Sequence, residues 1–205
     1  MKKENLILVG GGGHARSCID VIEMSGQYSI AGIVDLPERV HEKILGYEII
    51  ATDKDLPELA KQYNNFFISV GQILSPTKRL RIFDALNGLK VNMPVIISPR
   101  AYVSAHANIG KGTIVMHGAL VNAGSVIGDN CIINSNALVE HDCRIGNHCH
   151  ISTGALINGG VSVGDASFIG SGTVCNETIS IGKKSIISSK SNVAKDLPDN
   201  SLIRK

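Results

Sequence analysis

Histidines and acids are concentrated in one short stretch of this chain, Glu140-His141-Asp142-Cys143 followed by His148-Cys149-His150. An imidazole titrates near neutral pH and can take a proton from an amine or a hydroxyl that attacks an acyl group. An adjacent carboxylate, Asp142 or Glu140, could hold the ring in one tautomer. The residue types therefore predict general-base chemistry, and His141 is the leading candidate because acids flank it on both sides. The alternative is that these are surface histidines on a polar face, and for His148 it is as strong as the functional interpretation.

A second constellation is the run Gly10-Gly11-Gly12-Gly13-His14, which lies between an apolar segment (residues 6–9) and a helical one (residues 17–24). Glycines between a strand and a helix let backbone N–H groups approach an anion, and the helix N-terminus adds a partial positive charge. Asp35 ends the next expected strand, as in nucleotide-binding βαβ units. A glycine-rich turn packed tightly for steric reasons is the alternative. His14 could reach a phosphate or only face solvent.

The histidines lie within a stretch of the chain that repeats with a period of six residues. From Val103 to Val193 every sixth residue is Val or Ile, with Cys175 as the one exception. This period fits neither an α-helix nor a coiled coil, but it fits a short strand plus a turn, repeated. Three such units would make one triangular coil of about eighteen residues, with the branched side chains inside. Gly follows the aliphatic residue at several turns, where we expect it to relieve backbone strain.

Mostly small residues occupy the positions two before each aliphatic, and three of the five cysteines lie there: Cys131, Cys143 and Cys149. We interpret all five cysteines as buried small hydrophobes in a reducing cytoplasm. Zinc binding by nearby His and Cys is a rival interpretation. It is disfavoured because Cys143 and Cys149 belong to the inward-facing positions, and we expect no metal.

Residues 1–98 alternate short apolar runs with helical patterns, which predicts a small Rossmann-like βαβ domain with a parallel sheet. Residues 99–205 are predicted as an all-β domain of hexapeptide repeats. The first domain is about half of a full dinucleotide fold. A mononucleotide or a nucleotide-linked sugar therefore fits it better than NAD.

Composition excludes several other classes of protein. The 205 residues are 43% hydrophobic and 19% charged with a net charge of +2, so no nucleic-acid surface is indicated. No apolar run approaches the length of a membrane span, and the N-terminus lacks the apolar region of a signal peptide. We therefore expect a cytoplasmic protein without nucleic-acid or membrane partners.

These features together resemble the bacterial nucleotide-aminosugar N-acetyltransferase and sialic-acid O-acetyltransferase family. The glycine run with His14-Ala15-Arg16 is similar to the family's Gly-x-Gly-Gly-His signature, and Ile68-Ser69-Val70-Gly71-Gln72 with Arg79 matches a second segment. Glu140-His141-Asp142-Cys143 matches the catalytic segment. The resemblance covers nearly the whole chain, except that the end, 197–205, lacks the usual Gly-x-Pro-Ala-Lys-like tail.

The resemblance implies a left-handed parallel β-helix after the nucleotide-sugar-binding domain, and a homotrimer. It implies that His141 is the general base and that Asp142 supports it. It further implies two binding sets. The substrate-binding set is Gly12, Gly13, His14, Asp35, Gly71, Asn134 and His150. The acetyl-CoA-binding set is His150, Gly159, Gly160 and Ser171.

The expected activity is transfer of the acetyl group of acetyl-CoA, a co-substrate rather than a resident cofactor, to the amine of a nucleotide-linked amino-deoxysugar. A 4-amino-4,6-dideoxy sugar for surface-glycan synthesis is the expected acceptor. The alternatives are O-acetylation of a sialic acid or a relative, a zinc-dependent carbonic anhydrase-like lyase, and a non-catalytic nucleotide-sugar-binding protein. The sequence leaves UDP, dTDP, GDP and CMP open as the nucleotide.

Overall fold

A computed structural model describes residues 3–204, which form two compact units. The first unit contains residues up to 71 and residues 77–96, and the second contains residues 72–76 and everything from residue 97. The short segment 72–76 therefore packs with the second unit, although it lies inside the stretch 1–98 that the sequence predicted as one domain.

The first unit is built on a five-stranded sheet with the order β3-β4-β2-β1-β5. The parallel strands are β1 (Glu4–Val9), β2 (Tyr28–Val34), β4 (Tyr47–Ala51) and β5 (Asn65–Ile68), and β3 (Lys43–Ile44) pairs antiparallel with β4. The helices are α1 (Gly13–Ser25), α2 (Leu56–Gln62) and α3 (Thr77–Gly88), with 3-10 turns η1 (Pro37–Arg39) and η2 (Asp53–Asp55). This is the βαβ order that the sequence predicted.

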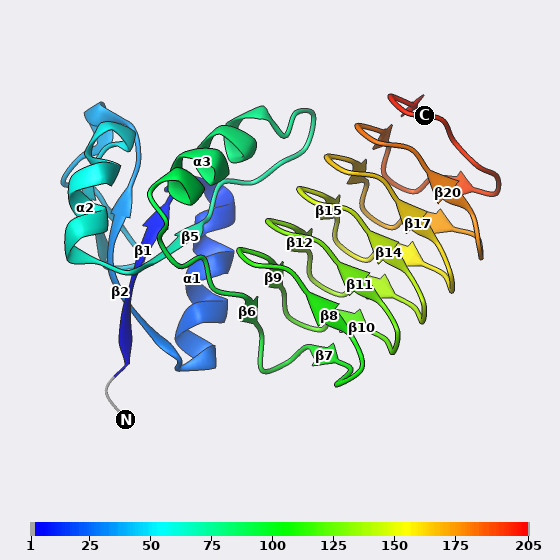
Figure 1. Ribbon diagram of the computed structural model, residues 1–205, viewed down its shortest axis with the longest axis horizontal. Coiled ribbons are helices and arrows are strands. Elements are labelled where there is room, and N and C mark those ends of the chain that lie inside the picture. Colours follow the sequence, from blue (N-terminus) through cyan, green and yellow to red (C-terminus); the bar gives the residue numbers. More distant parts are fainter. Residues whose placement is uncertain (1–2, 205) are drawn as a thin grey trace. The chain divides into compact units, whose positions relative to one another are not determined.

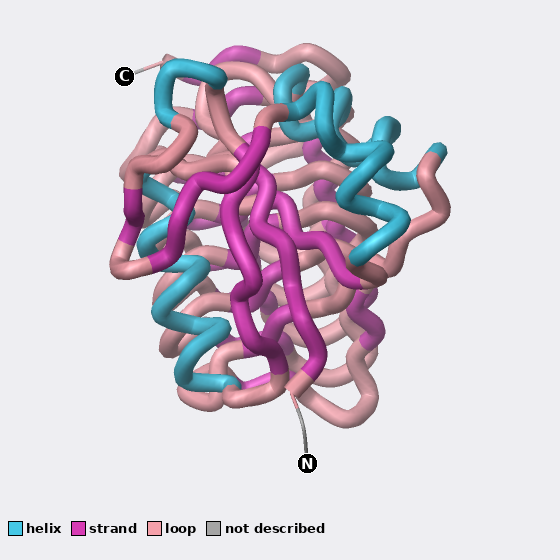
Figure 2. The backbone as a smooth tube through the Cα atoms, turned by 90° about the vertical axis from the view of Figure 1, so that its left-hand side faces the viewer, coloured by secondary structure: helices cyan, strands magenta, loops and turns pink. Residues whose placement is uncertain are grey.

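Successive residues of a strand point to opposite faces of the sheet. Both faces therefore carry apolar side chains, and helices cover them. Ile7 and Val9 of β1 belong to one core with Leu59 of α2 and Ile82 and Leu86 of α3. The buried residues of α1, among them Cys18 and Ile22, do not belong to this core, and Figure 2 shows helices on both sides of the strands. Between residues 3 and 204, no helix is both long and apolar enough to cross a membrane.

Arg79 shows how the end of β5 is fixed. Its side chain is 1% exposed, and its Nη1 donates to the carbonyl oxygens of Ile68 (2.8 Å) and Val70 (2.6 Å). A buried guanidinium must satisfy its donors inside the protein. The two bonds of Arg79 therefore hold the backbone at the end of β5 and in the loop after it.

The second unit is a triangular parallel β-helix whose two-residue strands stack into three sheets (Figure 1). One sheet contains β7 (Tyr102–Val103), β10 (Leu120–Val121), β13 (Leu138–Val139), β16 (Leu156–Ile157), β19 (Val174–Cys175) and β22 (Asn192–Val193). The second contains β8 (Asn108–Ile109), β11 (Val126–Ile127), β14 (Arg144–Ile145), β17 (Ser162–Val163) and β20 (Ser180–Ile181). The third contains β6 (Ile96–Ile97), β9 (Ile114–Val115), β12 (Ile132–Ile133), β15 (His150–Ile151), β18 (Phe168–Ile169), β21 (Ile186–Ile187) and β23 (Leu202–Ile203).

The aliphatic residues at every sixth position fill the interior, as the period of six predicted. From Val115 to Val193 each of them is buried, with at most 5% exposure. Val103 and Ile109 are only half-buried, because they lie in the first coil, at the end of the stack. The inward stack is therefore continuous through the histidine-rich coil, where Ile145 and Ile151 belong to the core.

The glycines that follow the aliphatic residues have a different role from the expected one. Backbone φ is positive at every sixth residue from Gly112 to Lys190, and those turn positions are two residues farther on than the glycines in question. At Gly128 and Gly164 an added Cβ would lie 2.8 and 2.5 Å from the backbone nitrogens of Asn147 and Lys183 in the next coil. These glycines are needed for close approach of successive coils and not for relief of strain at the turn.

The small residues that point inward also form hydrogen bonds. All five cysteines are buried and free of disulfides, in agreement with their interpretation as small buried groups. In addition, the thiols of Cys131, Cys143 and Cys149 donate to the carbonyl oxygens fifteen residues ahead, at 3.1, 3.1 and 3.2 Å. The hydroxyls of Thr113 and Ser125 donate in the same pattern. These residues therefore satisfy carbonyl groups at the corners.

The β-helix is longer than the predicted span of about 101 to 193. At its start β6 pairs with β9, and at its end β23 pairs with β21. Leu202 lies opposite Ile186, an offset of sixteen residues instead of the eighteen seen in the other coils. The last coil is two residues shorter, and for that reason the sequence period ends before the structure does.

The inward stack yields a stability prediction. Ile151 is 0% exposed, so Ile151→Ala should lower the free energy of unfolding by about 2–5 kcal/mol, the sum of lost burial and a cavity. Ser180→Ala, in an outward and exposed position of β20, is the control and should change it by less than about 0.5 kcal/mol. Denaturant unfolding measures both. An Ile151→Ala protein as stable as the control would contradict the inward assignment.

Candidate active site at the Glu140–Cys143 turn

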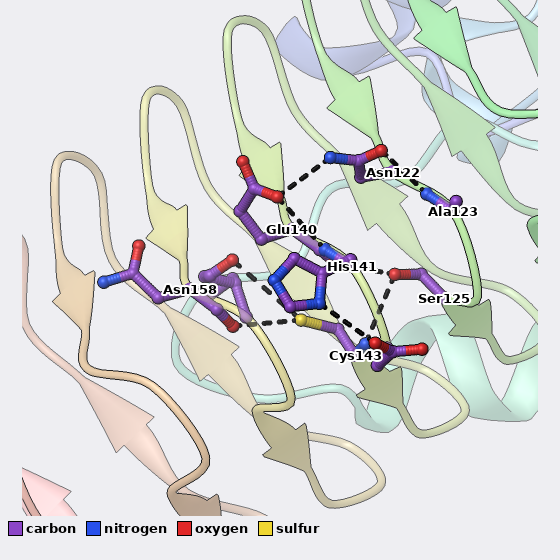
Figure 3. Close-up of polar contacts among 9 residues, drawn as sticks. Asn122, Ala123, Ser125, Glu140, His141, Cys143 and Asn158 are labelled. Atoms are coloured by element: carbon purple, nitrogen blue, oxygen red, sulfur yellow. Dashed lines mark hydrogen bonds and ion pairs between the residues drawn. The ribbon is translucent and has the colours of Figure 1, made fainter.

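His141 and Asp142 lie in the turn that joins β13 to β14 (Figure 3). Asp142 has φ of +60°, a conformation that short polar side chains tolerate better than branched ones. Its Oδ2 lies 2.9 Å from Nδ1 of His141. A carboxylate only accepts hydrogen bonds, so Nδ1 carries the proton and Nε2 keeps its lone pair. The contact with Asp142 thus fixes the tautomer, and in the neutral form of the ring Nε2 is the basic nitrogen.

The same contact changes the acidity of the imidazole. The pKa of His141 is raised above its ordinary value, chiefly by the hydrogen bond with Asp142. Desolvation opposes the shift, and the negative charges of Asp142 and Glu140 add to it. The side chain of His141 is 63% exposed, so a ligand can reach it from solvent. A raised pKa makes the neutral imidazole a stronger base.

Glu140 holds the backbone of the turn and not the ring. Its Oε2 accepts from Nδ2 of Asn122 (2.9 Å) and from the backbone nitrogen of His141 (3.2 Å). Its carbonyl oxygen accepts from Oγ of Ser125 at 2.6 Å. Of the two acids proposed to orient the imidazole, Asp142 does so and Glu140 does not. Asn122 and Ser125 escaped the sequence analysis because their only signal is a position eighteen or fifteen residues before Glu140.

The ring of His141 lies across Gly159 of the next coil. A Cβ built on Gly159 would fall 2.7 Å from both Cε1 and Nε2 of the imidazole. A residue with a side chain would displace the ring, so Gly159 provides the space in which His141 sits. Gly160, which follows it, has φ of +71° and continues the turn.

Cys143 lies close to His141 but is not a free nucleophile. It is 0% exposed, and its thiol donates to the carbonyl oxygen of Asn158 at 3.1 Å (Figure 3). Burial raises the pKa of the thiol, which disfavours the thiolate. Nothing at this turn therefore favours a covalent thioester on the protein.

His148 and His150 have other surroundings. His148 is a turn residue with φ of +58°, and its Nδ1 lies 3.0 Å from Nδ2 of Asn130. His150 lies on β15 and is 6% exposed, with its ring edge against Phe168 at a centroid distance of 5.2 Å. Of the three histidines, only His141 presents a largely exposed ring.

Two fixed partners define the tautomer of His150. Its Nδ1 contacts the carbonyl oxygen of Gln72, so Nδ1 donates. Its Nε2 accepts from Nδ2 of Asn134 at 3.0 Å, while Oδ1 of Asn134 accepts from the backbone nitrogen of Ser135. Gln72 also donates to the carbonyl oxygen of His148 at 2.9 Å, which fixes the segment 72–76 on this coil. No feature of the sequence predicts this contact beyond the position of Gln72 next to Gly71.

The structure does not bring all the expected residues together within one chain. His141, Gly159 and Gly160 lie on the edge between the first and second sheets. His150 and Asn134 lie on or beside the third sheet, which is opposite that edge in a triangular prism. Ser171 also lies away from Gly159, and its hydroxyl is 2.9 Å from that of Ser152. The expected acetyl-CoA-binding set is therefore divided between two edges.

The glycine run of the first unit separates into two pairs. Gly10 has φ of +110°, and a Cβ there would lie 2.4 Å from Val70; a Cβ on Gly11 would lie 2.6 Å from Asp35. Packing thus accounts for the first pair. A Cβ on Gly12 or Gly13 would meet nothing within 4 Å, and no side chain caps the start of α1. The second pair leaves open space in front of the helix N-terminus, where an anion could approach.

Asp35 and Gly71 flank this turn. Asp35 follows β2, is 9% exposed and accepts from the backbone nitrogen of Gly11 at 3.1 Å. Its Oδ2 also contacts Nη1 of Arg39, a residue that the sequence analysis missed. Gly71 lies against His14, because a Cβ on Gly71 would be 3.3 Å from Cβ of His14. Across residues 3–204, no three His, Cys, Asp or Glu side chains gather in a group that could hold a metal ion.

The pair at the turn yields a titration prediction. Asp142→Asn should lower the pKa of His141 toward its ordinary value, because the ring loses a charged acceptor and a nearby negative charge. The acid limb of any rate that depends on neutral His141 should then move to lower pH. NMR titration of the His141 ring measures the pKa. Glu177→Gln is the control, and an unchanged pKa in Asp142→Asn would contradict the assigned hydrogen bond.

Sequence profiles of two known domains match the chain. The PglD N-terminal domain profile matches residues 5–86. The bacterial transferase hexapeptide profile, of six repeats, matches residues 106–141 and 124–159. A search of curated protein sequences found no significant match.

Solved structures extend these matches to the whole chain. The acetyltransferase domain of PglB from Neisseria gonorrhoeae is 31% identical, with a TM-score of 0.89 over 98% of this chain and 96% of that one. PerB from Caulobacter crescentus, determined with CoA and GDP-perosamine, is 34% identical, with a TM-score of 0.90 over 97% and 92%. WeeI from Acinetobacter baumannii shares the fold at 18% identity and a TM-score of 0.84, over 98% and 96%. The chain belongs to the nucleotide-aminosugar N-acetyltransferase family, in which a PglD-type α/β domain precedes a left-handed β-helix of hexapeptide repeats.

Proposed function

We propose that this protein transfers the acetyl group of acetyl-CoA to the amine of a nucleotide-linked amino-deoxysugar. The observation that carries the proposal is the exposed His141, held by Asp142 over Gly159 with Nε2 basic. Relatives support the choice of substrates: the PglB domain has been determined with acetyl coenzyme A, and PerB with CoA and GDP-perosamine. By analogy with PerB, a 4-amino-4,6-dideoxy sugar is the proposed acceptor.

The proposed mechanism is direct transfer. The sugar amine attacks the thioester carbonyl carbon, and Nε2 of His141 takes the proton that the amine loses. The C–S bond breaks as the C–N amide bond is established, and the imidazolium returns its proton to the CoA thiolate. Asp142 stabilises the imidazolium throughout. The buried thiol of Cys143, whose pKa is raised, supports a mechanism without an acyl-enzyme.

The first unit is the proposed nucleotide site. The open space over Gly12 and Gly13 would take the phosphates at the start of α1, with His14 on the same turn. Gly71 would line the space beside them, and Asp35 would lie beside the nucleoside. The reduced thiols of the chain and the use of acetyl-CoA support a cytoplasmic setting, where the product would serve surface-glycan synthesis.

Each complete site is proposed to lie between two copies of the chain in a homotrimer. His141 lies on one edge of the prism, while Asn134 and His150 belong to the opposite face. A neighbouring copy would therefore have to supply the second group to the same acetyl group or sugar. An outward apolar row along the first sheet, Leu120, Leu138, Leu156 and Val174, offers a surface for packing the copies. Ser171, with Gly159 and Gly160, would line the acetyl-CoA channel between them.

The experiment that tests the function is an acetyl-CoA consumption assay against sugars linked to UDP, dTDP, GDP and CMP. We expect turnover with an amino-deoxysugar nucleotide and an amide product by mass spectrometry. An ester product from CMP-linked sialic acid or free sialic acid would favour the O-acetyltransferase alternative. Nucleotide-sugar binding without turnover of any acceptor would favour a non-catalytic binding protein.

The general-base assignment has a kinetic test. His141→Ala should lower kcat by about 10²–10⁴-fold with little change in either substrate's dissociation constant, because proton removal acts in the transition state. His148→Asn is the control, since Asn tolerates the positive φ at that turn. Steady-state kinetics of the two variants decide the matter. An inactive His148→Asn beside an active His141→Ala would show that the wrong histidine was chosen.

The shared site has a test by subunit mixing. His141→Ala and His150→Ala should each be impaired alone. Mixed trimers made by co-expression should recover activity, because about a quarter of the interfaces would combine an intact His141 with an intact partner His150. Recovery is measured on purified mixed trimers. If both histidines acted within one chain, every mixed trimer would stay as impaired as its parents.

A further inference from the structure

Arg39 contacts both Asp35, which follows β2, and the backbone of Gly11 in the glycine run. It lies at the end of η1, four residues after Asp35. Its Nη1 contacts Oδ2 of Asp35 and donates to the carbonyl oxygen of Gly11 at 3.1 Å, while its Nε donates to Oε2 of Glu42 at 3.0 Å. Because Asp35 also accepts from the nitrogen of Gly11, both polar groups of the Gly11 backbone are bound by this pair. The guanidinium and the carboxylate are therefore held in fixed positions beside the open half of the glycine run.

Two atoms of the pair remain available. Oδ1 of Asp35 and Nη2 of Arg39 have no hydrogen-bond partner within residues 3–204. The Asp35 side chain is 7% exposed and that of Arg39 is 29% exposed. A carboxylate that is more than nine-tenths buried gains from a second donor, because burial has removed most of its water. The pair thus leaves one carboxylate oxygen of Asp35 and the two N–H groups of one guanidinium nitrogen of Arg39 for a ligand.

A hydroxyl group fits this combination. It can donate its hydrogen to Oδ1 and accept from Nη2 with its oxygen at the same time. A pair of neighbouring hydroxyls would also use the second N–H of Nη2. Phosphate groups lack a hydrogen to donate when ionised, and the negative charge of Asp35 would repel them. The chemistry therefore favours a neutral diol over an anion at this position.

A nucleotide bound at the glycine run would bring such a diol to this place. Gly12 and Gly13, where the phosphates are proposed to lie, follow directly after the residue that the pair holds. In nucleotide-binding βαβ units, an acid at the end of the second strand lies within reach of the ribose. The ribose is the part of a nucleotide that carries neighbouring hydroxyls next to the phosphate.

We propose that Arg39 and Asp35 together bind the ribose hydroxyls, so that the protein selects ribonucleotide-linked sugars over 2′-deoxyribonucleotide-linked ones. The inference rests on the proposed function, because it assumes a nucleotide at the glycine run. It narrows the acceptor class to UDP-, GDP- or CMP-linked sugars and excludes dTDP-linked ones. In the competing interpretation Arg39 only fixes the fold of the glycine turn.

Calorimetry with matched nucleotides separates the two interpretations without any need for turnover. The full-length protein is titrated with UDP and 2′-deoxy-UDP, and with GDP and 2′-deoxy-GDP. We expect the wild type to bind each ribonucleotide at least about tenfold more tightly, the loss expected for one hydroxyl bound by charged partners. Arg39→Met should weaken ribonucleotide binding and reduce the preference to about twofold or less. Glu38→Gln, on the same 3-10 turn and exposed, is the matched control and should keep the wild-type preference.

Arg39→Lys is the second variant, in case loss of the positive charge beside Asp35 prevents folding. It keeps the charge but lacks the guanidinium fork, so it should also lose most of the preference. An equal weakening of both nucleotides in the folded variants, with the preference retained, would show a purely structural role and overturn the inference. Equal affinity of UDP and 2′-deoxy-UDP for the wild type would overturn it while leaving acetyl transfer intact. If no nucleotide bound at all, the proposed nucleotide site would fail together with the inference.

Discussion

Hydrogen bonds between successive coils are the interaction on which the second unit depends. Its strands are two residues long, far too short to be stable as separate elements. Each coil is held because its backbone donates to the next one, for example from Ile132 to Cys149 at 2.9 Å and from His150 to Ser167 at 3.0 Å. The stacked glycines after the aliphatic residues permit this close approach. Any change that separates two coils therefore affects both of them.

The stack of coils also fixes the geometry of the turn that we propose as the active site. Glu140 is tied to Asn122 in the coil before, and the ring of His141 rests on Gly159 in the coil after. The positive φ of Asp142 is simply the turn geometry repeated at every sixth residue. The proposed catalytic pair can therefore occupy a turn without altering the coil, since the inward side chains and the backbone hydrogen bonds support the fold. Exposure of the imidazole follows from the same arrangement.

In both units, hydrogen bonds fix the backbone of a turn, and polar groups that the fold does not need lie on that turn. In the first unit the Arg39–Asp35 pair fixes Gly11, and the open space over Gly12 and Gly13 remains for a ligand. In the second unit, turn contacts fix the backbone, and the Nε2 of His141 is the atom that we propose takes the substrate proton. The contacts differ in burial: the bond from Arg39 to Gly11 is half-buried, whereas those of the His141 turn are exposed.

The sequence by itself predicted an α/β unit followed by a β-helix, and it singled out the turn that we propose as the active site. A strict period of six can be read directly because each unit of the β-helix repeats the same environment for the same position. The strand–glycine–helix order of the first unit can also be recognised from consecutive residues of the sequence. His141 could be singled out because the solenoid has no structural need for a histidine between two acids, and the neighbouring Asp142 was a partner within reach in any turn geometry.

Only the tertiary structure decided which other groups take part, because those contacts join residues that are far apart in sequence. The contact of Gln72 with His150 and the bond from Arg39 to Gly11 leave no periodic signal. Gly159 lies one coil of eighteen residues after His141, but nothing in the sequence marks it as the residue under the imidazole. The last coil escaped detection because it is two residues shorter than the others. The separation of His141 from His150 could not be predicted from the sequence either. The chain passes one corner of the prism between these residues, which are nine positions apart, and the two side chains therefore lie on opposite sides of the prism.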